Sequence, residues 1–172
     1  MVYGAILAAG KGLRMGNELP KQFMMLGGKL LVMHSLETFH KCKELSRIFV
    51  AVPGAWIGYV RELLDGAGMD DRVRAVAGGE DRSESLMRVI SEINRVHGIS
   101  GEDIIVTHDA ARPFVTERMI IENIRAVAEY GACGTAIRAT DTVSRSADGA
   151  FMEDIPARET MYQNQTPQSF NI

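Results

Sequence analysis

This chain begins with one decisive stretch, Ala5-Ile-Leu-Ala-Ala-Gly-Lys-Gly-Leu-Arg-Met-Gly16, which is soon followed by Pro20-Lys-Gln-Phe23. The apolar run from Val2 to Ala8 predicts a buried strand, and the chain then breaks into a loop rich in glycine, lysine and arginine. Glycines let a backbone approach a ligand closely and turn its N–H groups toward an anion. Such a loop at the carboxyl end of a first strand favours the binding of a polyphosphate.

The spacing of the glycines separates this loop from the two commonest nucleotide-binding loops. Gly10-x-Gly12-x-x-x-Gly16 matches neither G-x-G-x-x-G nor G-x-x-x-x-G-K-[ST]. The segment also carries Lys11, Arg14 and Lys21, so we expect it to stabilise charge during a reaction as well as to hold a ligand. The alternative is an ordinary glycine-rich turn with solvated basic side chains.

The charge distribution favours a small anionic ligand. The whole chain has a net charge of −3, whereas residues 1–36 carry four basic side chains against Glu18 alone. Binding of nucleic acid usually requires a broad basic face. We therefore expect no nucleic-acid partner.

Length and composition predict one globular domain over residues 1–172. A hydrophobic content of 46% and a charged content of 24% are ordinary for such a domain. No apolar run approaches the ~18 residues that a membrane span needs, and we see no secretory signal. We therefore expect no membrane association. Cys42 and Cys133 lack metal-binding spacing, so we expect free thiols and a cytoplasmic location.

Strand-like and helix-like segments alternate along the chain. Asp81, with Glu84 at capping-box spacing, and Thr116 are expected helix caps, and Gly131 is an expected helix stop. The alternation predicts an α/β fold with a mostly parallel sheet flanked by helices. The expected strands are 2–8, 48–52, 73–77, 104–107 and 135–138, and the expected helices are 31–40, 55–64 and the segments after the two caps.

Residues 141–165 interrupt this alternation. Asp148-Gly149 is a hairpin turn signal between two strand-like segments, 142–146 and 150–155. We expect a protruding β-hairpin arm. It is either a plain surface hairpin or an arm that reaches a partner subunit.

Four polar segments follow the expected strands: 10–21, 78–85, 108–113 and 140–142. Because ligands bind beyond the carboxyl ends of parallel strands, we expect these segments to form one site. Asp109 is placed to hold Mg²⁺ on phosphates, although aspartate also caps helices and turns. Arg112 offers a bidentate phosphate donor, whereas His108 is expected to be structural.

Six motifs run in order over almost the whole chain, and their combination is specific although each alone is weak. They are Ala8-Ala-Gly-x-Gly-x-Arg-Met-Gly16, Pro20-Lys-Gln-Phe23, Gly78-Gly-x-x-Arg82-x-x-Ser85, His108-Asp-Ala-Ala-Arg-Pro-Phe114, Asp141-Thr142 and Gln165-Thr-Pro-Gln-x-Phe170. Together they resemble the alditol-phosphate cytidylyltransferase family, whose acceptors are 2-C-methyl-D-erythritol 4-phosphate or ribitol 5-phosphate.

The resemblance implies a Rossmann-like nucleotidyltransferase that converts CTP and an alditol phosphate to CDP-alditol and pyrophosphate. A phosphate monoester is already anionic, so the enzyme has to align two anions and offset charge without a general base. The implied roles are Arg14 and Lys21 in catalysis, Ala8, Ala9, Gly10, Gly12, Gly79, Glu80 and Ser85 in nucleotide binding, Asp109 as the Mg²⁺ ligand, and Arg112, Thr142 and Arg158 in binding the alditol phosphate.

The resemblance also implies a homodimer in which the arm crosses over and Arg158 binds the alditol phosphate in the partner's site. Within the family, residues 52–57, 104–109 and 161–172 look more like the ribitol-phosphate branch, whereas Ala111 looks more like the methylerythritol-phosphate branch. The balance favours ribitol 5-phosphate. Members of the family continue for roughly sixty residues past the Thr-Pro-Gln motif, so we expect the last part of the family's domain to be absent here.

Three other functions stay open at this stage. The first is a different sugar-phosphate nucleotidyltransferase. The second is a dinucleotide-dependent oxidoreductase, against which the basic loop argues, as does the lack of an acidic residue at the end of strand 48–52. The third is a non-catalytic nucleotide-binding module.

Overall fold

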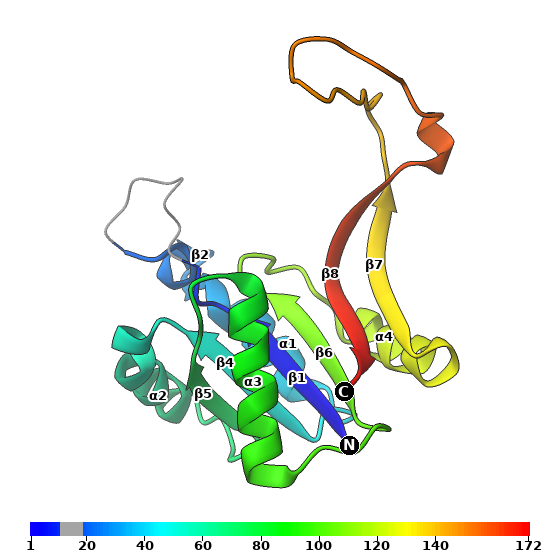
Figure 1. Cartoon of the computed structure of the whole chain (residues 1–172). Helices are drawn as coiled ribbons and strands as arrows, with labels where there is room; N and C mark the ends of the chain where they lie inside the picture. The colour runs from blue at the N-terminus through cyan, green and yellow to red at the C-terminus, as the bar shows by residue number, and fades with distance from the viewer. Residues whose placement is uncertain (11–18) are drawn as a thin grey trace.

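A six-stranded sheet forms the centre of this computed structural model, which describes residues 1–10 and 19–172 (Figure 1). The strand order is β5-β4-β1-β6-β8-β7. The parallel strands are β1 (Val2–Leu7), β4 (Arg47–Val52), β5 (Val73–Ala77) and β6 (Ile104–Asp109), and β8 (Tyr162–Asn171) runs antiparallel between β6 and β7 (Ala132–Arg138). The predicted α/β fold with a mostly parallel sheet is confirmed.

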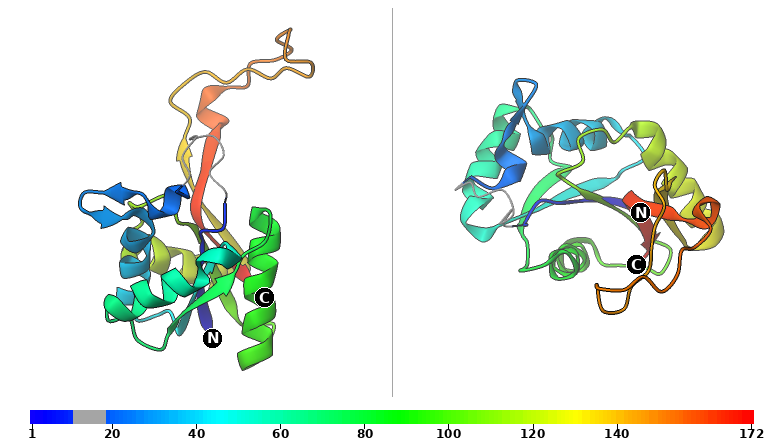
Figure 2. Two further views of the ribbon diagram at one scale, coloured as in Figure 1. Left: turned by 90° about the vertical axis from the view of Figure 1, so that its left-hand side faces the viewer. Right: turned by 90° about the horizontal axis from the view of Figure 1, so that it is seen from above.

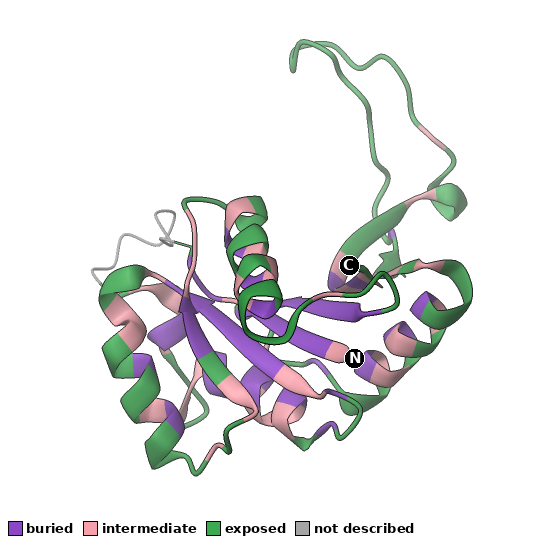
Figure 3. Ribbon diagram, turned by 60° about the horizontal axis from the view of Figure 1, so that its bottom comes forward, coloured by how far each residue is buried: buried purple, intermediate pink, exposed green. Residues whose placement is uncertain are grey.

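Helices cover both faces of the sheet (Figure 2). The helix α3 (Arg82–His97) packs on one face, and α1 (Leu31–Lys41), α2 (Ile57–Gly66) and α4 (Glu117–Tyr130) pack on the other. A separate apolar core lies on each face of the sheet, and side chains that alternate along β4 contribute to both. Phe49 faces α3, while its neighbours Ile48 and Val50 face the other three helices. The sheet is consequently the most buried layer of the molecule (Figure 3).

The helix signals in the sequence act as expected, with one shift. The carboxylate of Asp81 accepts a hydrogen bond from the Glu84 N–H at 2.7 Å, and the hydroxyl of Thr116 accepts one from the Met119 N–H at 3.3 Å. Gly131, with φ of 78°, ends α4. Helix α2 begins at Ile57 rather than at residue 55, because residues 54–56 form a 3₁₀ turn.

A short antiparallel hairpin, β2 (Met25–Leu26) and β3 (Lys29–Leu30), connects the glycine-rich segment to α1. Its turn consists of Gly27 and Gly28, which have φ of 57° and 82° and so occupy the region that side-chain-bearing residues avoid. The sequence analysis did not predict this hairpin.

Strand β8, which contains the motif Gln165-Thr-Pro-Gln-x-Phe170, was also not predicted. Prolines are rare in central strands because they cannot donate to the ladder. Here Pro167 lies where the pairing of β7 with β8 is irregular: Gly134 pairs with Gln168, whereas Ala136 already pairs with Asn164. The irregularity leaves residues 165–167 without pairing partners on β7.

The protruding arm is present, but its predicted strands are wrong. Residues 142–146 and 150–155 form only an isolated bridge between Arg145 and Asp154, and the arm rises on the ends of β7 and β8 (Figure 1). The predicted turn is confirmed, since the Asp148 carboxylate accepts hydrogen bonds from the N–H groups of Ala150 and Phe151. Within one chain, residues 140–160 are exposed apart from Pro156, and two strands with nothing to pack on are marginal in water.

Within the described ranges, none of the helices combines the length and the apolar character that crossing a membrane requires.

Candidate active site

A pocket of about 540 Å³ opens beyond the carboxyl ends of β1 and β6 and beside the start of α3. This is the place where open α/β sheets bind ligands. Its charged side chains are three cations and two carboxylates, and none of its described lining residues is histidine or cysteine. The lining residues are Leu7, Ala8, Ala9, Gly10, Lys21, Gln22, Asp81, Arg82, Ser85, Asp109, Ala110, Ala111 and Arg112.

The end of β1 forms the floor of this pocket. Ala8 extends the parallel pairing by donating its N–H to the Ala51 carbonyl at 2.8 Å, and both Ala8 and Ala9 are buried. Gly78 passes directly over this segment, and a Cβ there would collide with the side chain of Ala9. Of the predicted nucleotide-binding residues on this loop, Ala8, Ala9 and Gly10 line the pocket, whereas Gly12 lies outside the described residues.

Lys21 lines the pocket from a one-turn 3₁₀ helix, η2 (Lys21–Phe23). The next side chain, Gln22, is buried and donates from Nε2 to the Ala8 carbonyl at 2.5 Å, which ties η2 to the end of β1. Phe23 then stacks on Trp56 with ring centroids 4.8 Å apart, and Tyr59 completes an aromatic cluster. Lys21 is thus held from behind by two buried neighbours, while Arg14, the other predicted catalytic residue, lies outside the described residues.

The segment before α3 is built around the Ser85 hydroxyl. Its oxygen accepts from the Gly79 N–H at 3.0 Å, and the hydroxyl donates to the Asp81 carbonyl at 2.7 Å. The Glu84 carboxylate accepts from the Glu80 N–H at 2.7 Å, and this bond, with Arg88 nearby, lowers the pKa of Glu84. Ser85 lines the pocket as predicted, whereas Gly79 and Glu80 lie beside it and are not among its lining residues.

Asp109 lies between two arginines at the end of β6. Arg82 Nε is 3.2 Å from Oδ1 and Arg112 Nε is 3.5 Å from Oδ2. Each guanidinium also reaches a glutamine of β8: Arg82 donates to Gln168 Oε1 at 2.9 Å, and Arg112 donates to Gln165 Oε1. Asp109 and Arg112, both predicted site residues, therefore lie together in a network of carboxylate, arginines and amides.

The same network contains residues to which the sequence analysis gave no role. All three of these residues, Arg82, Gln165 and Gln168, belong to the motifs quoted above. Their membership of those motifs was the signal by which the sequence could have identified them. Their partners are distant in sequence, since Arg82 and Gln168 are separated by 86 positions. The contacts depend on β8 lying beside β6, which was not predicted.

His108 is structural, as predicted. It is 1% exposed, packs on the Phe39 ring with centroids 5.6 Å apart, and makes hydrogen bonds through both ring nitrogens. Burial lowers its pKa.

The expectation that four polar segments share one site is wrong for residues 140–142 within a single chain. Thr142 lies on the exposed arm, and Arg158 begins the 3₁₀ turn η4 (Arg158–Thr160) on the returning side of the arm, where its Nη1 is 3.5 Å from the Thr140 carbonyl oxygen. Neither residue lines the pocket of its own chain. Their part in binding the alditol phosphate stays a prediction.

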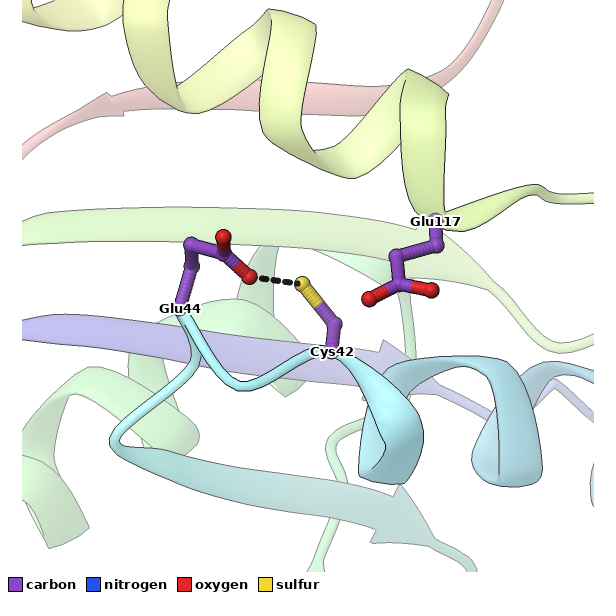
Figure 4. Close-up of side chains that lie close together, drawn as sticks. All are labelled: Cys42, Glu44 and Glu117. Atoms are coloured by element: carbon purple, nitrogen blue, oxygen red, sulfur yellow. Dashed lines mark hydrogen bonds between the residues drawn. The ribbon is translucent and has the colours of Figure 1, made fainter.

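The donor set of the pocket fits Mg²⁺ better than a transition metal. Of the two carboxylates that line the pocket, Asp81 caps α3, which leaves Asp109 as the candidate ligand, and Mg²⁺ is commonly held by one or two carboxylates together with substrate phosphates. In the part of the chain that the structure describes, three metal-compatible donors gather elsewhere, at Cys42, Glu44 and Glu117 (Figure 4). Burial and a hydrogen bond to Glu44 raise the pKa of the Cys42 thiol to about 11, which opposes the thiolate that a metal requires.

The fold and the site together define a Rossmann-like nucleotidyltransferase. The sequence model of the family IspD, 2-C-methyl-D-erythritol 4-phosphate cytidylyltransferase, matches residues 2–172. The chain belongs to this family, and it is a cytidylyltransferase. The predicted membership of the alditol-phosphate cytidylyltransferases is confirmed.

Solved structures agree with this assignment. A 4-diphosphocytidyl-2C-methyl-D-erythritol synthase from Anaerococcus prevotii matches with a TM-score of 0.82 and 27% identity, over 99% of this chain and 69% of that one. The 2-C-methyl-D-erythritol 4-phosphate cytidylyltransferase of Francisella tularensis matches with a TM-score of 0.74 and 27% identity, over 99% and 72%. The Thermus thermophilus enzyme, at 24% identity and a TM-score of 0.68 over 99% and 71%, shares the fold.

Proposed function

We propose that the pocket joins CTP to 2-C-methyl-D-erythritol 4-phosphate and releases pyrophosphate. The observation that carries this proposal is the convergence of Lys21, Arg82 and Arg112 with the carboxylate of Asp109 beyond parallel strand ends. Such a site suits two anionic substrates. The family to which the chain belongs supplies the choice of nucleotide and acceptor.

The chemistry needs no general base, in keeping with the lack of histidine and cysteine among the described lining residues. A phosphate oxygen of the acceptor attacks the α-phosphorus of CTP, and the bond from that phosphorus to the bridging oxygen of pyrophosphate breaks. Negative charge grows on the oxygens around the α-phosphorus and on the leaving group. Lys21, with Arg14, offsets this charge. A positively charged group that is already oriented toward the reacting atoms does not have to reorganise during the step, so its stabilisation is fully available.

Asp109 holds Mg²⁺ in this proposal, together with phosphate oxygens of the nucleotide. The ion, when bound, neutralises phosphate charge and helps to orient the triphosphate. Arg82 and Arg112, which contact Asp109 in the structure, are the described cations that line this side of the pocket. Arg112 then binds the acceptor phosphate.

Ribitol 5-phosphate is the second candidate acceptor. Segments 52–57, 104–109 and 161–172 resemble the ribitol-phosphate branch, and the last of these contains β8 with Gln165 and Gln168. Gln168 accepts from Arg82 and Gln165 from Arg112, so this segment contacts two arginines that line the pocket. We propose that the sequence of this segment helps to determine the acceptor.

One experiment tests the function and the acceptor together. Pyrophosphate release is measured with each of the four nucleoside triphosphates, crossed against the two alditol phosphates. Release that requires CTP and is fastest with 2-C-methyl-D-erythritol 4-phosphate is the expected result. Faster release with ribitol 5-phosphate would transfer the protein to the other branch. CTP binding without release from any pair would favour a non-catalytic module, and a blue-shifted NADH emission would favour an oxidoreductase.

Asp109→Asn is expected to reduce turnover by about 10-fold to 100-fold and to raise the Mg²⁺ concentration needed for half-maximal rate. The amide keeps the shape of the side chain but loses the charge that attracts the cation. The measurement is a Mg²⁺ titration of initial rates. Asp70→Asn is the matched control, because Asp70 is also paired with an arginine, Arg72, at 3.0 Å but lies away from the pocket. A normal rate and Mg²⁺ dependence in Asp109→Asn would contradict the assignment.

We further propose that the protein is a cytoplasmic homodimer joined through the arm of residues 141–165. The arm protrudes from the single domain that residues 1–172 form. Phe151, Met152 and Ile155 are 76%, 62% and 53% exposed, and one chain offers the arm nothing to pack on. A two-fold partner supplies such a surface symmetrically. The dimer also gives Thr142 and Arg158 a place near a pocket, that of the partner.

A further inference from the structure

A closed ring of hydrogen bonds supports the turn that presents Asp109 and Arg112. The His108 Nε2 atom lies 2.9 Å from the Arg112 carbonyl oxygen, and its Nδ1 atom lies 2.9 Å from the Thr166 hydroxyl. The same hydroxyl accepts from the Asp109 N–H at 3.3 Å. The Arg112 N–H returns to the Asp109 carbonyl at 3.0 Å, which closes the turn itself.

The chemistry of these partners fixes the hydrogens of the ring. A backbone carbonyl only accepts, so Nε2 of His108 carries the proton and donates to Arg112. The Asp109 N–H only donates, so the Thr166 oxygen accepts from it and uses its own proton for Nδ1 of His108. Every member is then satisfied with His108 neutral and protonated on Nε2. The arrangement is buried, because the side chains of His108 and Thr166 are almost completely covered.

We propose that His108 and Thr166 are positioning residues for the reaction: they hold both ends of the segment 109–112, and thereby set where the carboxylate of Asp109 and the guanidinium of Arg112 stand. His108 acts on the carboxyl end of the turn and Thr166 on its amino end. Neither is among the residues that line the pocket. The inference rests on the proposed function for the roles of Asp109 and Arg112.

Because Thr166 belongs to β8, the hydrogen-bonded ring connects segment 109–112 to that strand. Gln165, the preceding residue, accepts from the Arg112 guanidinium, so one short piece of β8 holds Arg112 by its side chain and, through His108, by its carbonyl. The Ser35 hydroxyl of α1 also donates to that carbonyl at 3.3 Å. The turn is therefore fixed from β8 on one side and from α1 on the other.

Thr166→Val is the direct test, because valine keeps the shape and removes the hydroxyl. We expect the KM for the alditol phosphate and the half-saturating Mg²⁺ concentration to rise, with kcat/KM for the acceptor falling about 10-fold to 100-fold. At saturating Mg²⁺ the KM for CTP should stay within about twofold, because the other residues assigned to its triphosphate lie on the β1 side of the pocket. Thr166→Ser, which restores the hydroxyl, is expected to recover most of the loss.

Thr107→Val is the matched control. Thr107 is buried in the same pair of strands and donates to the Gln168 carbonyl at 2.8 Å, but it makes no bond to segment 109–112. We expect a loss of thermal stability similar to that of Thr166→Val with unchanged KM values. A Thr166→Val protein in which only the active fraction falls, with every KM unchanged, would overturn the proposal.

Two further measurements keep the proposal testable if Thr166→Val does not fold. ¹⁵N spectra of the ligand-free protein distinguish protonated from bare ring nitrogens, and His108 should show a proton on Nε2 and a bare Nδ1. His108→Gln can place an amide N–H near the position of Nε2, so it should retain more acceptor affinity than His108→Asn, which is too short to reach Arg112. A proton on Nδ1, or equal losses in the two variants, would overturn the proposal.

These outcomes are separate from a failure of the proposed function. If the wild-type protein releases no pyrophosphate, the function fails whatever the spectra show. If the wild type is active and the ring has the other tautomer, only this inference fails.

Discussion

Lys21→Ala is expected to lower kcat by on the order of a hundredfold, corresponding to ~3 kcal/mol of lost transition-state stabilisation, with little change in the KM for CTP. The reason is that the charge which Lys21 offsets appears mainly as the α-phosphorus is attacked. Gln22 and Phe23 hold η2 in place, so the substitution removes the ammonium group without loosening its support. Steady-state kinetics with varied CTP separate the two effects.

Arg14→Ala is expected to behave in the same way, on the basis of its place in the first motif. Lys29→Ala is the control for loss of a lysine, since Lys29 forms an ion pair with Glu37 at 2.6 Å outside the pocket. Turnover close to normal in Lys21→Ala would remove the main support for its catalytic role. A large rise in the KM for CTP at constant kcat would make Lys21 a binding residue instead.

Activity is expected to return when two inactive variants, Arg14→Ala and Arg158→Ala, exchange subunits. If the arm crosses the interface, each site combines Arg14 of one protomer with the partner's Arg158. A mixed dimer then has one intact site, so equal mixing should restore about one quarter of the wild-type rate. The measurement is pyrophosphate release after exchange, with mixed dimers quantified by two affinity tags.

The matched control for this experiment is a mixture of Arg14→Ala with Lys21→Ala. Both residues belong to the same protomer's share of the site, so no mixed dimer has an intact site and no activity should return. If mixed dimers form and the Arg14→Ala and Arg158→Ala pair stays inactive, the arm does not complete the partner's site.

The predictable part of the fold is the part with local signals. Asp81, Thr116 and Gly131 mark helix ends through bonds within a few residues, and the central parallel strands β1 and β4 are largely apolar runs buried on both faces. Strand β8 has neither kind of signal. It is polar, contains Pro167, and owes its conformation to β6 and β7, which flank it. The same applies to the arm, whose expected strands lack a surface to pack on within one chain.

The site divides in a similar way. Lys21, Ser85, Asp109 and Arg112 were predictable because each follows a strand or opens a helix, and all four line the pocket. The arginine and glutamine network around Asp109 was not, since it is assembled by the pairing of β6 with β8 across some sixty positions. Arg158 was grouped with the site by resemblance, and Thr142 both by resemblance and by its place after an expected strand. Neither lines the pocket of its own chain.

The stack of Trp56 on Phe23 allows intrinsic tryptophan fluorescence to report on the surroundings of η2. The chain contains one tryptophan, so its emission comes from a single place, and Phe23 is only two positions from Lys21. We expect the emission to change when a triphosphate draws Lys21 and η2 toward it. Nucleotide affinity can then be measured by fluorescence titration in variants that no longer turn over, where kinetic constants give no access to it.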